Sequence, residues 1–175
     1  MRKLKLKELN RTNVSAFKKQ DKIPIVLVLD NIRSGLNVGS AFRTGDAFAL
    51  EKILLCGITA QPPHREILKT AIGATESMDW QYFESTVAAI ADLKKSGYRI
   101  VAVEQAENST FLQDFEVKNE DKIALVFGNE VAGVSDEVME IVTESIEVPQ
   151  FGTKHSLNIS VCIGVVVWDL FGKIS

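Results

Sequence analysis

Short apolar runs alternate along the chain with segments of helical periodicity, and this alternation constrains the fold more than any other feature. The apolar runs predict strands at residues 23–29, 52–56, 79–83, 99–103, 123–127 and 145–148. The helical patterns fall at residues 38–49, 65–71, 86–95, 136–142 and 157–171. Because most of these strands are apolar throughout rather than alternating, they suit a mostly parallel sheet with helices on both faces. The sequence therefore predicts an α/β fold.

The chain has the size and composition of one compact domain. Its 175 residues are 46% hydrophobic, which is enough to form a core without a disulfide or a metal. No internal repeat or linker interrupts residues 23–175, so we expect one domain there, preceded by an extension over residues 1–22. The longest apolar stretch, residues 159–171, is shorter than a membrane span.

The cysteines and histidines do not form a metal-binding pattern. Cys56 and Cys162 both lie inside apolar runs, where a free thiol behaves as a small buried hydrophobe. The sequence has no CxxC or HExxH motif and only two histidines, so we expect no metal site. Unpaired cysteines of this kind favour a reducing compartment, and we expect a cytoplasmic protein that does not enter a membrane.

The first 22 residues form a basic extension ahead of an acidic remainder. They hold eight basic and two acidic residues, whereas residues 23–175 hold 12 basic and 21 acidic residues. A basic arm of this kind is typical of a chain that contacts a polyanion, because each neutralised phosphate releases a counterion. The alternative is a solvated segment whose apolar residues, such as Leu4 and Phe17, dock on the core.

The loop after the first predicted strand carries polar residues at the edge of the sheet where open α/β folds bind ligands. It runs from Asp30 into a predicted helix whose first turns hold Asn37 and Arg43. The two residues are six apart, so they lie on similar faces of the helix without touching along it. Either residue also has a structural explanation, since Asn37 could cap the helix and Arg43 could be a surface arginine.

A second polar loop, Gly128 to Ser135, follows the fifth predicted strand. The spacing of Gly128 and Gly133 resembles the start of a P-loop. Val134 and Ser135, however, occupy the positions of its lysine and hydroxyl residue. Since no GxGxxG follows any predicted strand either, the sequence disfavours NTP and dinucleotide sites. Glu130 lies directly beyond a buried strand and is a candidate for orienting a cation, although it could also be an exposed loop carboxylate.

A third polar loop, residues 148–160, again leads from a strand into a helix. Ser156, Asn158 and Ser160 are spaced by two, so they cannot all share one helix face. Asn158 inside an apolar helix is costly unless its amide is paired. The structural alternative is that Ser156 caps the helix and that Asn158 bonds a neighbouring loop carbonyl. His155 has no sequence neighbours that would complete a catalytic triad.

Together the three loops resemble the SpoU/TrmH family of RNA 2′-O-ribose methyltransferases, in the SPOUT class. The family's motifs are an Asn-x-Gly followed by Arg-Thr, a Gly-x-Glu-x-x-Gly loop after an apolar strand, and a proline-containing loop leading to Ser-Leu-Asn-x-Ser. The matching residues, in that order, are Asn37-Val38-Gly39 with Arg43-Thr44, Gly128-Asn129-Glu130 with Gly133, and Pro149 and Gly152 with Ser156-Leu157-Asn158-Ile159-Ser160. The resemblance covers residues 23–172, and it departs from the family at Gly45 and at Gln150-Phe151.

The resemblance implies a fold, a cofactor and an assembly. It implies a C-terminal trefoil knot, in which S-adenosylmethionine is bound mostly by backbone groups. Matched by position, the cofactor contacts fall near Gly128, Val148 and Leu157. Members of the family are homodimers that pack their knot helices together, and their site draws on both chains. The apolar last helix, predicted at residues 157–171, would suit that role.

The resemblance also implies roles for the polar residues. Arg43 matches the residue regarded as activating the 2′-hydroxyl group, but a guanidinium stays protonated. We therefore expect Arg43 to stabilise the developing alkoxide or to clamp the adjacent phosphate. By the same resemblance, Asn37 and Glu130 would orient Arg43. Ser156 and Asn158 would hold the substrate ribose and the loop.

The expected function is S-adenosylmethionine-dependent 2′-O-ribose methylation of RNA, with transfer RNA slightly favoured over ribosomal RNA. Two alternatives belong to other classes. One is a catalytically inactive RNA-binding protein of the same fold. The other is an α/β nucleotide hydrolase, which the missing P-loop lysine weakens.

Overall fold

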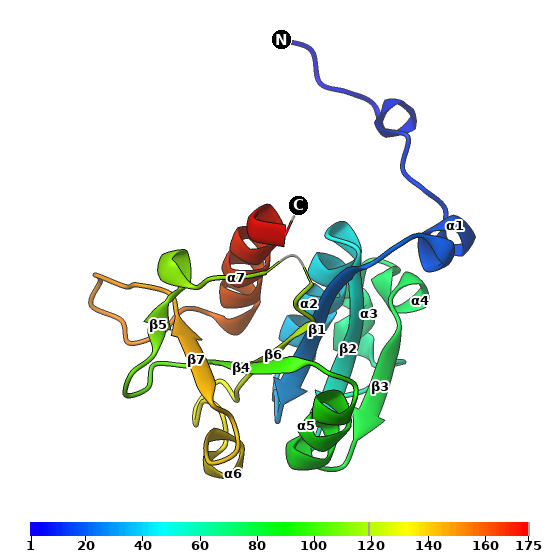
Figure 1. The fold of residues 1–175 in the computed structure, drawn as a ribbon. Coiled ribbons are helices and arrows are strands. Elements are labelled where there is room, and N and C mark those ends of the chain that lie inside the picture. The colour runs from blue at the N-terminus through cyan, green and yellow to red at the C-terminus, as the bar shows by residue number, and fades with distance from the viewer. Residues whose placement is uncertain (119, 175) are drawn as a thin grey trace.

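The computed structural model describes residues 1–118 and 120–174, and its centre is a sheet of seven strands that all run parallel (Figure 1). The strands are β1 (Ile23–Asp30), β2 (Leu50–Cys56), β3 (Trp80–Phe83), β4 (Arg99–Val103), β5 (Thr110–Phe111), β6 (Ile123–Phe127) and β7 (Glu144–Glu147). Their order across the sheet is β3-β2-β1-β6-β4-β7-β5. The predicted parallel α/β fold is confirmed, whereas the trefoil knot stays a prediction.

Helices cover both faces of this sheet. The helical segments are η1 (Leu6–Leu9), α1 (Val14–Lys19), α2 (Gly35–Ala47), α3 (Arg65–Ala71), α4 (Ala74–Ser77), α5 (Thr86–Lys95), η2 (Leu112–Asp114), α6 (Asp136–Met139) and α7 (Ile159–Ile174), and of these η1 lies on the N-terminal arm, away from the sheet. Side chains alternate between the two faces of a strand. In β1, Leu27 and Leu29 therefore join the core formed with α2, α3 and α7. Val26 and Val28 join the opposite core, formed with α5 and α6.

The structure confirms the predicted long elements and adds short ones. The strands β4 and β6 and the helices α3 and α5 have the bounds that the sequence predicts. The elements missing from the prediction are all short: η1, α1, α4, β5 and η2 have four, six, four, two and three residues. Segments so short give no periodic pattern. Within the described residues, no helix has the length and apolar character needed to cross a membrane.

The polar residues at the starts of two helices differ from their expected places. Asn158 directly precedes α7, and its Oδ1 accepts a hydrogen bond from the main-chain N of Ser160 at 2.9 Å, as an N-cap does. The expectation that Ser156 caps this helix is therefore wrong. Helix α2 begins three residues before its predicted start and is capped by Ser34, whose hydroxyl accepts from the main-chain N of Asn37 at 3.3 Å.

The N-terminal extension consists of a free arm and a docked helix. Residues 1–5 and 7–13 are exposed, and the arm reaches away from the body of the molecule (Figure 1). Helix α1 is anchored by Phe17, which is only 6% exposed and belongs to the core. The Nζ atom of Lys22 lies 3.1 Å from the centre of the Phe17 ring. The expected docking is thus confirmed for Phe17, whereas Leu4 is exposed.

Candidate functional site

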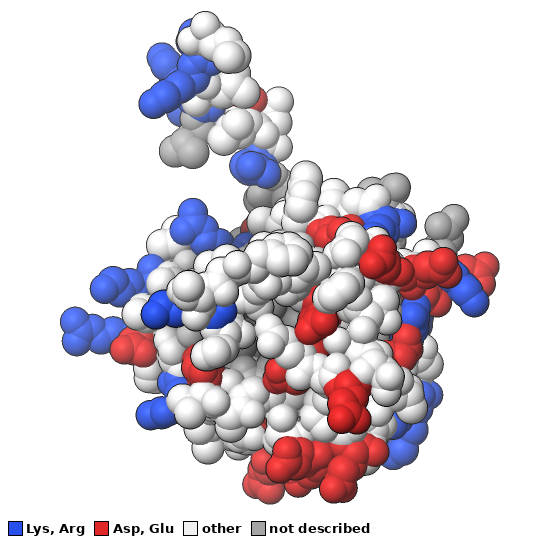
Figure 2. Space-filling model, turned by 90° about the vertical axis from the view of Figure 1, so that its left-hand side faces the viewer, with Lys and Arg blue, Asp and Glu red and all other residues white. Residues whose placement is uncertain are grey.

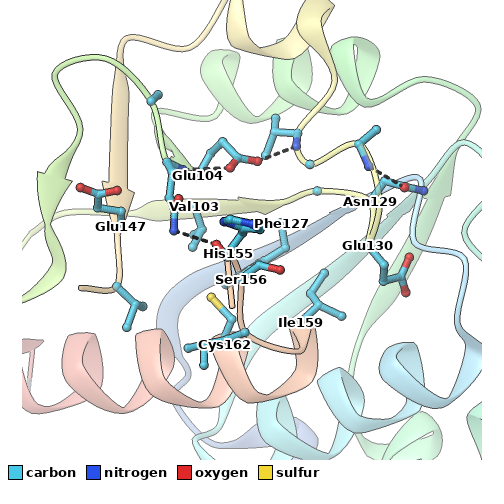
Figure 3. A pocket seen from close by; sticks show the side chains of 18 of the residues that line it. Val103, Glu104, Phe127, Asn129, Glu130, Glu147, His155, Ser156, Ile159 and Cys162 are labelled. Carbon is cyan, nitrogen blue, oxygen red and sulfur yellow. Dashed lines mark hydrogen bonds between the residues drawn. The ribbon is translucent and has the colours of Figure 1, made fainter. Parts of the chain in front are cut away.

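A cavity of about 800 Å³ opens at the carboxyl ends of β4, β6 and β7, beside the start of α7 (Figure 3). This is the edge at which parallel α/β sheets bind ligands, and the volume lies within the range of small-molecule sites. Its walls include the segment after β4 (103–106), the second polar loop (127–134), the end of β7 (146–148), residues 155–159 and Cys162.

Six of the eight predicted site residues line this cavity. They are the expected cofactor contacts Gly128, Val148 and Leu157, and the polar residues Glu130, Ser156 and Asn158. Asn37 and Arg43 lie on α2, outside the lining. The structure therefore brings the second and third motifs together around one space, with the first motif beside it.

The second polar loop forms a tight turn that leaves no room for a side chain at Gly128. The main-chain N–H groups of Asn129 and Gly133 each donate to the other residue's carbonyl oxygen, at 2.8 and 2.9 Å. A Cβ atom at Gly128 would lie 2.0 Å from both the carbonyl carbon of Gly133 and the main-chain N of Val134. Gly133 itself has a φ of +73°, which favours glycine. At Gly128, the loop therefore presents main chain to the cavity.

Asn129 holds this loop in place, a role that the sequence does not predict. Its Oδ1 accepts hydrogen bonds from the main-chain N atoms of Val131 and Ala132, at 2.9 and 3.1 Å. Its Nδ2 donates to the carbonyl oxygen of Asn31 at 2.7 Å. Because asparagine is common in turns of every kind, residue type alone could not single it out.

Glu130 joins the second loop to the start of α2. Its carboxylate accepts hydrogen bonds from the main-chain N atoms of Arg33 and Ser34, at 2.9 and 3.0 Å, and from Nδ2 of Asn37 at 3.0 Å. Burial raises the pKa of Glu130, but the hydrogen bonds from Arg33, Asn37 and Ser34 outweigh it, so the pKa lies below its ordinary value. The partners of this carboxylate are amides rather than the expected cation.

Asn37 links the first motif to the third. Its Oδ1 accepts a hydrogen bond from Nδ2 of Asn158 at 3.3 Å, while its own Nδ2 donates to Glu130. The Oδ1 of Asn158 accepts from both the main-chain N and the hydroxyl of Ser160, at 2.9 and 2.6 Å. One chain of hydrogen bonds thus joins the three motif segments. Ser156 lies in the exposed loop before α7.

Arg43 is exposed on α2, away from the cavity of its own chain. It follows Asn37 by six residues, which places it roughly 9 Å farther along the helix axis. Among the described residues, neither a hydrogen bond nor an ion pair joins Arg43 to Glu130 or Asn37. Within the part of the chain that the structure describes, these two residues therefore hold the loops together without a hydrogen bond to the Arg43 guanidinium.

Asp30 is a buried carboxylate that stabilises the end of the second polar loop by a hydrogen bond. It is fully buried at the end of β1, and its Oδ2 accepts a hydrogen bond from the main-chain N of Ser135 at 2.8 Å. Its Oδ1 accepts from the Thr86 hydroxyl and from Nδ2 of Asn31. The predicted first strand ends at Leu29 and leaves Asp30 in the loop, although a carboxylate directly after an apolar run was the available signal.

Comparisons with known proteins agree on one family. The profile of the SpoU rRNA Methylase family matches residues 24–168. A protein of Staphylococcus saprophyticus assigned to the TrmH family of tRNA/rRNA methyltransferases is 31% identical over 160 residues, which are 91% of this chain and 63% of that protein. A tRNA (guanosine(18)-2′-O)-methyltransferase of Borreliella burgdorferi is 27% identical over 150 residues, which are 86% of this chain and 67% of that protein.

Solved structures show the same fold. The structure of an AdoMet-bound rRNA methyltransferase from Sinorhizobium meliloti matches with a TM-score of 0.77 at 24% identity, covering 87% of this chain and 58% of that chain. This chain thus spans about two thirds of the length of each of the two curated relatives. It spans a little over half of the length of the Sinorhizobium meliloti protein.

Proposed function

The chain belongs to the SpoU rRNA Methylase family, and on that premise we propose that it transfers a methyl group from S-adenosylmethionine to a ribose 2′-hydroxyl of RNA. The observation that carries the proposal is the cavity at the carboxyl ends of β4, β6 and β7. Gly128, Val148 and Leu157 line it, and the hydrogen bonds that join Glu130, Asn37 and Asn158 lie beside it.

The residues around the cavity fit S-adenosylmethionine. Phe127, Leu157 and Ile159 give it apolar walls suited to an adenine ring and a methylene chain, while the turn at Gly128 supplies main-chain polar groups. Asp30, Asn129 and the main-chain bonds of that turn fix its position without a ligand. When bound, the cofactor supplies an electrophilic methyl group on a sulfonium.

The residues of the chain would hold the reacting groups and stabilise charge. Gly128, Val148 and Leu157 would hold the cofactor, whose methyl group would be transferred to the ribose 2′-oxygen while the hydroxyl proton passes to water. Arg43 would stabilise the negative charge that develops on the oxygen, since its guanidinium donates several hydrogen bonds and does not lose its proton. Ser156 and Asn158 would contact the ribose and the loop.

The exposed position of Arg43 supports a homodimer in which each cavity receives Arg43 from the partner subunit. Arg43 lies outside its own cavity, and α2 packs against α7. The outer face of α7 carries Val161, Val165 and Trp168, which are 51%, 39% and 66% exposed. Such an apolar stripe suits an isologous interface between two copies of the helix.

The proposed substrate is RNA, with transfer RNA slightly favoured over ribosomal RNA. One relative is a tRNA methyltransferase and another belongs to a family of tRNA/rRNA methyltransferases, while the structural neighbour is an rRNA methyltransferase. Figure 2 shows Lys and Arg side chains on the N-terminal arm, where they would contact phosphates. Work on such RNA would place the protein in the cytoplasm.

The experiment that tests this function is methyl transfer from labelled S-adenosylmethionine to unmodified transfer RNA and, in parallel, to ribosomal RNA. Nucleoside digestion of the product would then show which position carries the label. A labelled 2′-O-methylnucleoside from either pool is the expected result. Binding of RNA without any binding of S-adenosylmethionine would instead identify a catalytically inactive RNA-binding protein.

A further inference from the structure

The cavity is lined by carboxylates without a compensating Lys or Arg. Its lining holds Glu104, Glu130, Asp136 and Glu147, and among the described residues that line it there is no lysine or arginine. A cavity whose walls carry one sign of charge concentrates ligands of the opposite sign. The proposed function gives this charge a ligand, because S-adenosylmethionine has a net charge of +1, with a sulfonium, an ammonium and a carboxylate.

Glu104 is a carboxylate of the cavity wall whose two oxygens are both held by main-chain N–H groups. It follows the last residue of β4 and is partly buried. Its Oε1 accepts a hydrogen bond from the main-chain N of Gln105 at 2.8 Å, and its Oε2 accepts from the main-chain N of Val134 at 2.9 Å (Figure 3). Because both oxygens accept from N–H donors, the hydrogen bonds match an ionised carboxylate.

The loop opposite Glu104 is shaped to admit its side chain. A Cβ atom at Gly133 would lie 2.3 Å from Oε2 of Glu104, so the missing side chain at Gly133 makes room for the carboxylate. Across the cavity, burial and the negative charge of Glu104 raise the pKa of the Cys162 thiol to about 11. The field of Glu104 therefore reaches the face of α7 that lines the same space.

The other carboxylates of the lining are placed less centrally. Glu130 is turned toward α2, where three donors occupy its carboxylate. Asp136 is exposed on α6. In Figure 3, Glu147 lies at the β7 end of the cavity and Glu130 at the opposite end, with Glu104 between them.

We propose that Glu104 makes the cavity discriminate by charge, so that it binds cationic S-adenosylmethionine more tightly than S-adenosylhomocysteine. The two molecules differ by the methyl group and by the sulfonium charge, since the product is a neutral thioether overall. A fixed negative charge near the ligand therefore strengthens the binding of S-adenosylmethionine relative to that of S-adenosylhomocysteine. This inference rests on the proposed function, and it makes Glu104 a specificity-determining residue rather than a catalytic one.

The test is calorimetric binding of three ligands to the protein. They are S-adenosylmethionine, S-adenosylhomocysteine and sinefungin, in which an amine-bearing carbon replaces the methylsulfonium. For Glu104→Gln we expect the affinity for the two cationic ligands to fall about threefold to tenfold, with less than a twofold change for S-adenosylhomocysteine. Glu137→Gln is the matched control, because it removes the same charge from an exposed position of α6 outside the lining.

The comparison between ligands separates charge from structure. The Gln side chain cannot accept hydrogen bonds from both main-chain N atoms. If the role of Glu104 were purely structural, the variant would therefore bind all three ligands more weakly by the same factor. That result would overturn this inference and leave the proposed function standing. If the unaltered protein bound none of them, the proposed function would fail and the inference with it. A measurement without any variant gives a second check: the ratio of the two affinities should fall as salt rises from about 50 to 300 mM, and a constant ratio contradicts the inference.

Discussion

At the residue scale, Asn158 shows how a polar residue that is costly inside a helix becomes part of a site by preceding it. Its Oδ1 accepts a hydrogen bond from the main-chain N of Ser160 at the start of α7, and its Nδ2 donates one to Oδ1 of Asn37 on α2. The sequence indicates that this amide needs a partner. It could not indicate which one, because 121 residues separate Asn37 from Asn158.

Substitution of Arg43 tests the proposed charge stabilisation. We expect Arg43→Ala to lower kcat by about 100-fold or more, the size of effect seen when one donor to a developing oxyanion is removed. Binding of S-adenosylmethionine, measured by calorimetry, should stay within about twofold, because the residues proposed to hold the cofactor, among them Gly128 and Leu157, do not include Arg43. The control is Arg65→Ala on the exposed surface of α3. Turnover near that of the unaltered protein would show that Arg43 lacks this role.

Glu130 should make stability depend on pH in a defined direction. Its pKa is lowered in the folded protein, so its stabilising contribution is complete above the unfolded value of about 4.3 and is lost as pH falls through the folded value. We expect Glu130→Gln to lower the midpoint of urea unfolding at about pH 7. The difference in midpoint between the variant and the unaltered protein should become smaller toward about pH 3.5. If this difference in urea midpoint were the same at every pH, the ionised carboxylate would not be what stabilises the loops.

At the scale of elements, the sequence determines strands and helices better than it determines the contacts of the loops between them. β4 and β6 could be predicted to the residue, because each is a short apolar run between polar residues. The contact between Glu130 and Arg33 joins residues 97 apart, and no local pattern encodes it. The three motifs could be located from the sequence, whereas the supporting roles of Asp30, Glu104 and Asn129 appear only once the strand ends are side by side.

The turn at Gly128 should be intolerant of even one methyl group. In Gly128→Ala the new Cβ would meet the main chain at Gly133 and Val134, so the turn must open. We expect a loss of about 1 to 3 kcal/mol in the free energy of unfolding, measured by urea denaturation, together with weaker binding of S-adenosylmethionine. Gly152→Ala is the matched control, since nothing lies within 4 Å of a Cβ built there. Equal stability of the two variants would contradict this account of the turn.

At the scale of the whole molecule, charge is divided between a basic arm and an acidic cavity. The arm residues Arg2, Lys3, Lys5, Lys7 and Arg11 are exposed. Replacing these five with glutamine should weaken RNA binding and lower the slope of log affinity against log salt, by about 0.7 to 0.9 for each phosphate that the arm no longer neutralises. Filter binding at several salt concentrations would measure both quantities. S-adenosylmethionine affinity should not change, because the arm lies outside the cavity.

The control for the arm is a second variant of the body. Lys69→Gln with Lys95→Gln removes two exposed charges from α3 and α5. For this double variant we expect the slope of log affinity against log salt to change less, per charge removed, than it does for the arm variant. If the arm variant kept the full slope, the arm would serve only as a solvated segment tethered by Phe17.

The proposed dimer makes a prediction that no single-chain site can meet. Arg43→Ala removes the guanidinium and keeps the cavity, whereas Leu157→Trp fills the cavity and keeps Arg43. Each variant alone should be nearly inactive, and calorimetry should confirm that Leu157→Trp does not bind S-adenosylmethionine. If the two are unfolded and refolded together in equal amounts, half of the dimers are mixed and each contains one intact site, so activity should recover to about a quarter of that of the unaltered protein. If Arg43 instead served its own chain, every mixed dimer would lack an intact site, and the mixture would stay as inactive as its parents.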